Sequence, residues 1–336
     1  MTDSGPQPGA DPTVSVVLPV YNTAGTIADC LRSVAGQTLR PGQLILVDDC
    51  GGDDAIDVAR RTLADLDLPY LVLRHDRNRR IGAARNTGLA RATGEWIWFL
   101  DSDDQAEPAF LARLVEAAIE HRADIAVCRT RRVDPAGNPL DVVESRWRCP
   151  TVSGEQAARL LLTDRMKAYA CNKVFRRRSL PNAPFDLDRS YEDFRPVLRT
   201  LLRATSVALI DEPLYRYTVD PASVSGHFGR HTFDLLAVAD DVHAELVCYG
   251  LSRRWRTDYL TYLLGNVVLP LANMALRAEH AGRADATTRA AVAAARRRAR
   301  VADLVRLLAA GRIHPVVAGG VLKAAPALYS RVLAYR

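Results

Sequence analysis

The chain has 336 residues, of which 48% are hydrophobic and 25% are charged. This length allows two domains, or one α/β domain with a large extension, and excludes a short peptide scaffold. The composition excludes wholesale disorder, and six dispersed cysteines without a CxxC pair exclude a zinc knuckle or a dense disulfide framework. Such cysteine usage is typical of a reducing, cytoplasmic setting.

The formal net charge of +6 comes from the end of the chain. Residues 1–229 hold 29 basic and 31 acidic side chains, whereas residues 230–336 hold 16 and 8. Because the first two thirds are nearly neutral, the charge gives no support for nucleic-acid binding.

Residues 1–12 are polar and rich in Gly and Pro, which predicts a disordered tail without a signal peptide. Beyond them, short β-branched runs alternate with segments of helical period. Strands are expected at residues 14–19, 44–47, 70–73, 96–100 and 124–128, and helices near residues 27–34, 79–93 and 111–119. This alternation predicts an α/β fold, with a mostly parallel sheet flanked by helices.

The later part of the chain has a different pattern. Residues 130–155 are rich in turn-forming residues and predict a surface hairpin or loop insertion. From about residue 230 the sequence is helical and rich in Ala, Leu and Arg, so we expect an α/β domain over residues 13–229 and a basic helical region over residues 230–336. The uncharged stretch 259–276 reaches the lower limit for a membrane span, but Pro270 within it favours a buried core helix.

Polar side chains follow three of the predicted strands, and ligands bind beyond the carboxyl ends of strands in parallel sheets. Residues 19–22 follow the first strand, residues 48–49 the second and residues 101–104 the fourth. Asp101 and Asp103 are two residues apart at a strand end and therefore share a face. Oxygen ligands of this kind suit Mg²⁺ or Mn²⁺ bound with a nucleotide diphosphate. A lone Asp-x-Asp is more often a helix cap than a metal site, but the agreement of three strand ends favours the metal site.

These residues also resemble a known family. Five segments look like successive motifs of family 2 glycosyltransferases, namely VSVVLPVYN (14–22), LILVDDCGGD (44–53), GAARNTGL (82–89), GEWIWFLDSDD (94–104) and YEDF (191–194). The resemblance covers about residues 13–225. It implies the GT-A fold and transfer of a sugar from a nucleotide-diphosphate sugar.

The resemblance assigns one group of residues to the nucleoside. Pro19, Tyr21 and Asn22 would line the nucleoside pocket. Asp49 would hydrogen-bond the base, and Asp48 would support that loop. The implied donor is a UDP-, GDP- or dTDP-sugar, with a UDP-sugar expected first.

A second group would bind the ribose and the diphosphate. Asp101 would reach the ribose, and Asp103, with Asp101 beside it, would bind the Mg²⁺ or Mn²⁺ that bridges the phosphates. Ser102 lies between them and belongs to the same donor site, and Arg85 would lie near the donor. The alternative for Arg85 is a solvated surface arginine.

The resemblance places the chemistry at Glu192 and Asp193. Asp193 would be the catalytic base that takes the proton of the acceptor hydroxyl, with inversion at the anomeric carbon, and Glu192 would contact the acceptor. The alternative is a pair of helix-start carboxylates favoured by the helix dipole. The implied acceptor is a glycan, a lipid-linked molecule or a polymer in cell-envelope or polysaccharide biosynthesis.

The basic end of the chain and two rival functions allow further interpretations. Beyond residue 281 there are 11 basic and 2 acidic residues, which fits a peripheral contact with the inner face of a membrane, a solvated face or a contact in a homo-oligomer. A haloacid-dehalogenase-type phosphatase would use Asp101 as nucleophile, but Gln105 stands where that motif has Thr or Val. A catalytically inactive nucleotide-sugar-binding scaffold is the other rival, and the absence of GxGxxG after the first strand argues against a dehydrogenase.

Overall fold

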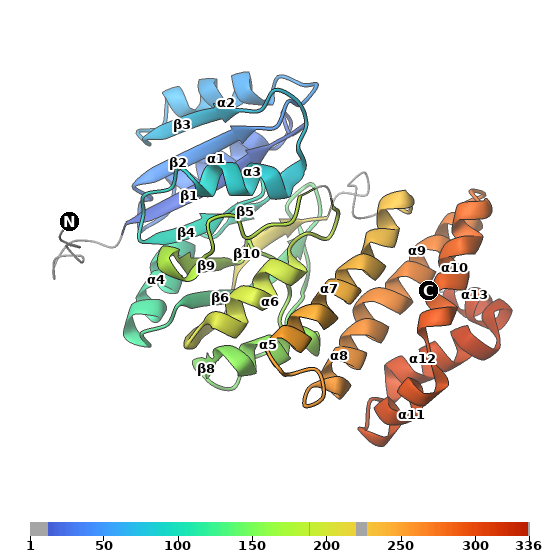
Figure 1. Cartoon of the computed structure of the whole chain (residues 1–336). Helices are drawn as coiled ribbons and strands as arrows, with labels where there is room; N and C mark the ends of the chain where they lie inside the picture. The colour runs from blue at the N-terminus through green and yellow to red at the C-terminus, as the bar shows by residue number, and fades with distance from the viewer. Residues whose placement is uncertain (1–12, 188, 220–226, 335–336) are drawn as a thin grey trace. The chain divides into compact units, whose positions relative to one another are not determined.

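The computed structural model describes residues 13–187, 189–219 and 227–334, so the expected tail at residues 1–12 lies outside the described residues. The chain forms two compact units, each built from separate stretches (Figure 1). The first comprises Met1–Gly154, Tyr169–Asp188 and Thr200–Thr218, and the second Glu155–Ala168, Arg189–Arg199 and Val219–Arg336. Three stretches of the expected α/β domain therefore belong with the C-terminal helices: Glu155–Ala168, Arg189–Arg199 and the residues from Val219 on.

The first unit is built on a mixed sheet whose strands run in the order β3-β2-β1-β4-β9-β6-β10-β5, with β7 beside β6 and β8 beside β10. The strands are β1 (Val14–Val20), β2 (Gln43–Asp48), β3 (Tyr70–Arg74), β4 (Trp96–Phe99), β5 (Gln105–Ala106), β6 (Ile125–Val133), β7 (Pro139–Val142), β8 (Thr151–Ser153), β9 (Lys173–Arg176) and β10 (Ser206–Thr218). The four strands β3, β2, β1 and β4 are parallel, as expected. Beyond them β9 joins antiparallel to both β4 and β6, and β6 with β7 forms the expected hairpin. The predicted α/β fold is confirmed.

Helices cover both faces of the parallel strands because side chains alternate along each strand. Val16 and Leu18 of β1 share a core with α1 (Ile27–Ala35), α2 (Ala55–Ala64) and α4 (Phe110–Glu120).

Val17, on the opposite face of β1, meets α3 (Arg80–Leu89). A Cβ on Gly88 of that helix would lie 2.4 Å from Cγ1 of Val17. The small residues of α3 therefore let it lie close to the sheet, as the sequence predicts.

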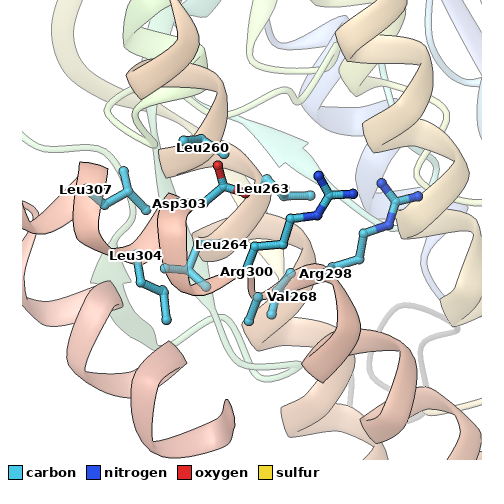
Figure 2. A pocket seen from close by; sticks show the side chains of 10 residues that line it. Leu260, Leu263, Leu264, Val268, Arg298, Arg300, Asp303, Leu304 and Leu307 are labelled. Carbon is cyan, nitrogen blue, oxygen red and sulfur yellow. The ribbon is translucent and has the colours of Figure 1, made fainter.

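The second unit is helical, as expected for the C-terminal extension. Its helices are α7 (Asp234–Cys248), α8 (Arg256–Tyr262), α9 (Leu269–His280), α10 (Ala286–Arg298), α11 (Val301–Ala309), α12 (Ile313–Ala324) and α13 (Pro326–Ala334), and α5 (Gly154–Leu162) and α6 (Phe194–Arg203) belong to it in part. Leu260, Leu263 and Leu264 meet Leu304 and Leu307 of α11 around a pocket of about 10 Å³, room for no more than about one water (Figure 2).

One helix in the described part of the chain, Arg256–His280, is long and apolar enough to cross a membrane. It consists of α8, a π-helical turn at Leu263–Val268 and α9. Pro270 has no N–H for the carbonyl four residues earlier, which accounts for the irregular turn just before it. Inside the unit, 61% of its most apolar window is buried, as in a core helix.

Candidate functional site

The loops after β1 and β2 are tied to each other at the carboxyl edge of the sheet. Asn22 and Cys50 both have positive φ, 53° and 60°, so each loop turns sharply as its strand ends. The Asn22 side-chain oxygen accepts a hydrogen bond from the N–H of Gly52 at 2.7 Å. A Cβ on Gly51 would lie 2.9 Å from the backbone nitrogen of Asn22, so this approach needs glycine.

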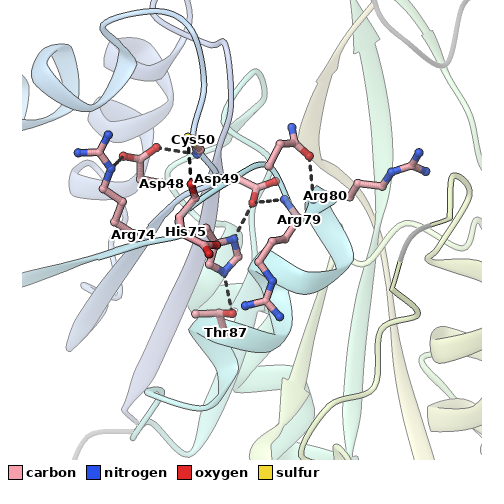
Figure 3. Close-up of polar contacts among 10 residues, drawn as sticks. Asp48, Asp49, Cys50, Arg74, His75, Arg79, Arg80 and Thr87 are labelled. Atoms are coloured by element: carbon pink, nitrogen blue, oxygen red, sulfur yellow. Dashed lines mark hydrogen bonds and ion pairs between the residues drawn. The ribbon is translucent and has the colours of Figure 1, made fainter.

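Asp49 is firmly held at this edge, with only 2% of its surface exposed. Its Oδ1 lies 2.6 Å from Nδ1 of His75 and accepts the backbone N–H of Arg79 at 2.8 Å (Figure 3). Since a carboxylate only accepts, Nδ1 is the donor of this bond, and Nε2 lies 2.9 Å from the Thr87 hydroxyl. Both bonds fall on Oδ1, which leaves Oδ2 without a partner among the described residues.

Sequence reasoning missed His75. The residue follows β3, a half-exposed strand, and lies in none of the family-like motifs. The available signal was its position: a histidine directly after a strand of the parallel sheet lies at the same edge as Asp49.

The remaining nucleoside-side residues surround this loop. The Asp48 carboxylate accepts the N–H of Cys50 at 3.0 Å and lies 3.4 Å from Nε of Arg74. Pro19 is buried within β1, whereas Tyr21, two residues later, exposes 46% of its surface. A ring exposed to this degree at the sheet edge is able to stack on a planar ligand.

Arg85 and Asp101 form the second fixed element of the site. Arg85 on α3 is 1% exposed, and its guanidinium lies 2.7 Å from Oδ1 of Asp101 and 5.2 Å from the ring centroid of Phe185. The alternative of a solvated surface arginine is therefore wrong. Because Arg85 is almost fully buried, its charge depends on the polar groups around it, of which the partly exposed Asp101 is one.

The loop that carries Phe185 is locked onto α3. The Asn86 side chain donates to the carbonyl of Phe185 at 2.9 Å and accepts its N–H at 3.1 Å. A Cβ on Gly82 would lie 2.2 Å from the carbonyl oxygen of Asp186, so only glycine permits this approach. The GAARNTGL segment thus positions the Phe185 ring that packs against Arg85.

The four residues after β4 divide into buried and exposed ones. Asp104 is 1% exposed and accepts the Tyr215 hydroxyl at 2.6 Å and the Thr218 N–H at 2.8 Å. Burial, followed by the charges of Asp103 and Asp101, raises the pKa of Asp104 well above its usual value. Ser102 is buried and its carbonyl accepts a bond from Thr26, whereas Asp103 is exposed.

Cation ligands are available at this position. Among the described residues, Asp101, Asp104 and Cys171 offer ligand atoms that all lie within 4.8 Å of one another. The carboxylates suit a hard cation, but the buried Cys171 thiol is a soft ligand that suits neither Mg²⁺ nor Mn²⁺. By this donor chemistry, the partly exposed Asp101 and the exposed Asp103 fit Mg²⁺ or Mn²⁺ that retains water and phosphate ligands.

Glu192 and Asp193 belong to the second unit, directly before α6. The carbonyl of Asp193 accepts the N–H of Val197 at 3.0 Å and so begins the hydrogen bonding of the helix. The structure thus brings the donor-side residues together within the first unit and puts the expected catalytic carboxylates at a helix N-terminus of the other.

Comparison with known proteins gives a family and a set of relatives. The family model described as Glycosyl transferase family 2 matches residues 15–182, half of the chain. The succinoglycan biosynthesis protein ExoO of Rhizobium meliloti is 29% identical over 237 residues, which cover 68% of this chain and 67% of ExoO. Glycosyltransferase GlyA of Streptococcus pneumoniae is 27% identical over 222 residues, 64% of this chain and 32% of GlyA. The chain spans 65%, 32% and 63% of the length of three curated relatives.

Two solved structures have a similar fold. S. aureus TarS 1–349 in complex with UDP-GlcNAc has a TM-score of 0.57 at 19% identity, over 81% of this chain and 88% of that one. Mannosyltransferase PcManGT from Pyrobaculum calidifontis, in complex with GDP-Man and Mn²⁺, has a TM-score of 0.53 at 18% identity, over 99% and 89%. At these identities the likeness concerns the fold alone, and it confirms the expected GT-A fold.

Proposed function

This chain belongs to glycosyl transferase family 2, and we propose that it moves a sugar from a nucleotide-diphosphate sugar to an acceptor hydroxyl with inversion at the anomeric carbon. One observation carries the proposal. The parallel strands β2 and β4 both neighbour β1 and end at one edge of the sheet, where Asp49 is held by His75 and Asp101 by Arg85. Two fixed carboxylates followed by the exposed Asp103 suit a nucleoside base, a ribose and a metal-bound diphosphate in turn.

Asp49 supports recognition of the base. Its Oδ2 can accept a hydrogen bond but cannot donate one. Uracil, thymine and guanine each carry a ring N–H that can donate to it. The family resemblance implies a UDP-, dTDP- or GDP-sugar, and we propose a donor of this class, with UDP first. TarS binds UDP-GlcNAc and PcManGT binds GDP-Man, two donors within this class.

The phosphate end is proposed to take Mg²⁺ or Mn²⁺, and PcManGT, a protein of similar fold, was solved with Mn²⁺. Asp103 would hold the cation, with Asp101 beside it as a second ligand and as the partner of the ribose. The bound cation would neutralise the charge that builds on the departing diphosphate. Arg85 fixes Asp101 from the buried side, so its carboxylate would keep one orientation while the donor binds.

Asp193 is proposed as the catalytic base and Glu192 as a contact of the acceptor. Only an ionised carboxylate can take a proton, and Asp193 lies beside Glu192 directly before α6. As the acceptor oxygen attacks the anomeric carbon, its proton would pass to Asp193 and the nucleoside diphosphate would leave from the opposite face. Attack from the opposite face inverts the configuration.

The proposed setting is polysaccharide or cell-envelope biosynthesis on the cytoplasmic side of a membrane. ExoO is a succinoglycan biosynthesis protein, and another relative, from Bacillus spizizenii, is a poly(ribitol-phosphate) beta-glucosyltransferase. The acceptors in polysaccharide and cell-envelope biosynthesis are polymers or are carried on lipids. We therefore propose a glycan, lipid-linked or polymer acceptor close to a membrane surface.

Neither rival function is favoured. A phosphatase would need Asp101 as a free nucleophile, but Oδ1 of Asp101 is bonded to the buried Arg85. An inactive scaffold is not favoured because relatives such as GlyA are themselves described as glycosyltransferases.

The experiment is a panel of UDP-, GDP- and dTDP-sugars with Mn²⁺, in which release of the nucleoside diphosphate is measured with and without short glycan acceptors. We expect one donor class to be turned over. Asp193→Asn should keep donor affinity and lose transfer by about 100-fold or more, while Asp57→Asn, an exposed carboxylate on α2, should match the parent. Transfer by Asp193→Asn at the parental rate would refute the base assignment, and turnover of no nucleotide sugar would refute the function.

A further inference from the structure

The last three helices expose an unusual amount of aliphatic surface. Of the fifteen large hydrophobic side chains that stand out as exposed in the described residues, seven lie on α11, α12 and α13, each 50% to 64% exposed. They are Val301, Val305, Leu308, Ile313, Val317, Leu328 and Val332. Exposed aliphatic side chains concentrated in so short a stretch of chain mark a candidate contact surface.

The packing of α11 shows that these side chains are not needed inside the unit. Its inward face is provided by Leu304 and Leu307, which meet α8 and the π-helical turn (Figure 2). Val301, Val305 and Leu308 follow each other at intervals of four and three residues and form a second apolar row on the same helix. The helix is therefore apolar on two faces, of which one is already used.

The two following helices repeat this arrangement. On α12, Val316 and Leu322 are buried, whereas Ile313 and Val317 are 62% and 58% exposed. On α13, Leu328 and Val332 are one helical turn apart and are both exposed. Each helix packs on its neighbour in chain order and still presents aliphatic groups outward.

The same segment carries almost only positive charge. Between residues 299 and 334 the single acidic side chain is Asp303, and Arg256 binds it at 3.0 Å. Arg300, Arg306 and Arg331 are exposed. Aliphatic and cationic side chains exposed in the same segment match the two layers of an anionic lipid surface, acyl chains below phosphates.

We propose that α11, α12 and α13 attach the enzyme to an anionic lipid surface, with the exposed aliphatic side chains in the acyl boundary and the arginines at lipid phosphates. The inference rests on the proposed function in one respect, because a lipid-linked acceptor requires the enzyme at a membrane. A second copy of the chain is a poorer occupant, since a two-fold interface would set the arginines of the two copies against each other.

The test is co-sedimentation of the full chain with phosphatidylcholine vesicles and with vesicles that contain 30% phosphatidylglycerol. We expect at least ten-fold stronger partitioning onto the anionic vesicles. The triple serine variant Val305→Ser, Leu308→Ser, Val317→Ser should no longer bind either kind of vesicle. The triple glutamine variant Arg300→Gln, Arg306→Gln, Arg331→Gln should bind both kinds equally and so lose the preference for anionic lipid. The matched control is Ile119→Ser with Leu140→Ser, two aliphatic residues 50% and 55% exposed on the first unit, and it should partition like the parent.

Equal partitioning of parent and triple variants, or no partitioning of the parent, would overturn the proposal. A parent dimer in light scattering that the serine variant converts to a monomer would also overturn it, in favour of a second copy. Hydrolysis of the nucleotide sugar without vesicles separates the two proposals, because the serine variant should keep it. If the parent bound vesicles but hydrolysed no nucleotide sugar, the proposed function would be refuted and the proposed lipid-binding surface would still stand.

Discussion

The His75 ring and the Asp49 carboxylate form a buried pair, with Nδ1 2.6 Å from Oδ1 and both side chains at most 4% exposed. Thr87 of α3 holds the other ring nitrogen, so the orientation of Asp49 is set by α3 as well as by its own strand. In the proposed base contact, a carboxylate held in this way would need no rearrangement when the nucleotide arrives, which would lower the ordering cost of binding.

Replacing His75 tests this positioning role. Ordering a side chain on binding costs about 0.5 to 1.5 kcal/mol, so His75→Ala should weaken UDP binding by roughly two- to ten-fold. His75→Asn, whose amide N–H can take the place of Nδ1–H, should recover part of the affinity. Calorimetric titration with UDP and Mn²⁺ measures both, with the exposed His314→Ala as control. Equal affinities for the parent and His75→Ala would refute the role.

The Arg85–Asp101 pair should contribute to folding as well as to binding. Arg85→Met keeps the volume of the side chain but leaves the Asp101 charge without its partner, so we expect a loss of about 3 kcal/mol in the free energy of unfolding. The control is Arg113→Met, because Arg113 meets Glu212 at the same 2.7 Å but with both side chains nearly half exposed. That pair should contribute no more than about 1 kcal/mol. Urea unfolding measures both variants, and similar losses would contradict the importance of burial.

Asp103 should carry the metal dependence of nucleotide binding. Asp103→Ala is expected to abolish the gain in UDP affinity that Mn²⁺ gives the parent, without changing the affinity measured in EDTA. Asp57→Ala should behave like the parent. Cys171→Ala should also keep the Mn²⁺ effect, because a thiol is a poor ligand for that ion. If Cys171→Ala lost the Mn²⁺ effect and Asp103→Ala kept it, the cation would have to bind at Asp101, Asp104 and Cys171 instead.

Glu245 should make the stability of the helical unit depend on pH. Burial tends to raise its pKa, but bonds from Arg199 and Arg195 lower it below the usual value overall. A lowered pKa in the folded state means that the ionised form stabilises the fold above the unfolded pKa of about 4.3, and that this contribution is lost as the pH falls through the lower folded value.

The pH dependence is tested with Glu245→Gln. The variant should be less stable than the parent at pH 7, and the difference in the free energy of unfolding should shrink as the pH falls below about 4. Urea titrations at several pH values provide the measurement. A difference that stays constant down to pH 3 would show that Glu245 acts through its shape and not through its charge.

The parallel half of the fold could be predicted from sequence because its signals are local. Each of β1, β2 and β4 is a short buried run that ends in polar residues, and Asp48, Asp49 and Asp101 follow directly from that position. By contrast, β9 pairs with β4 and β6, which are distant in the chain, and no local pattern fixes such a pairing.

Parts of the site were beyond sequence reasoning for a related reason. Asp103 and Asp104 are adjacent and chemically identical, yet one is exposed and the other is buried against Tyr215, a residue more than one hundred positions away. His75 joins the site only because β3 lies next to β2 in the sheet. These differences come from tertiary contacts and are absent from the motifs.

In the proposed donor site, a nucleotide diphosphate is bound through a cation at the carboxyl edge of the sheet. A crystal structure of the chain with UDP and Mn²⁺ tests this most directly. We expect the base to donate its N–H to Asp49, the ribose to meet Asp101 and Mn²⁺ to join Asp103 to the two phosphates. UDP bound elsewhere on the protein, or bound here with Mn²⁺ absent from Asp103 and Asp101, would contradict it.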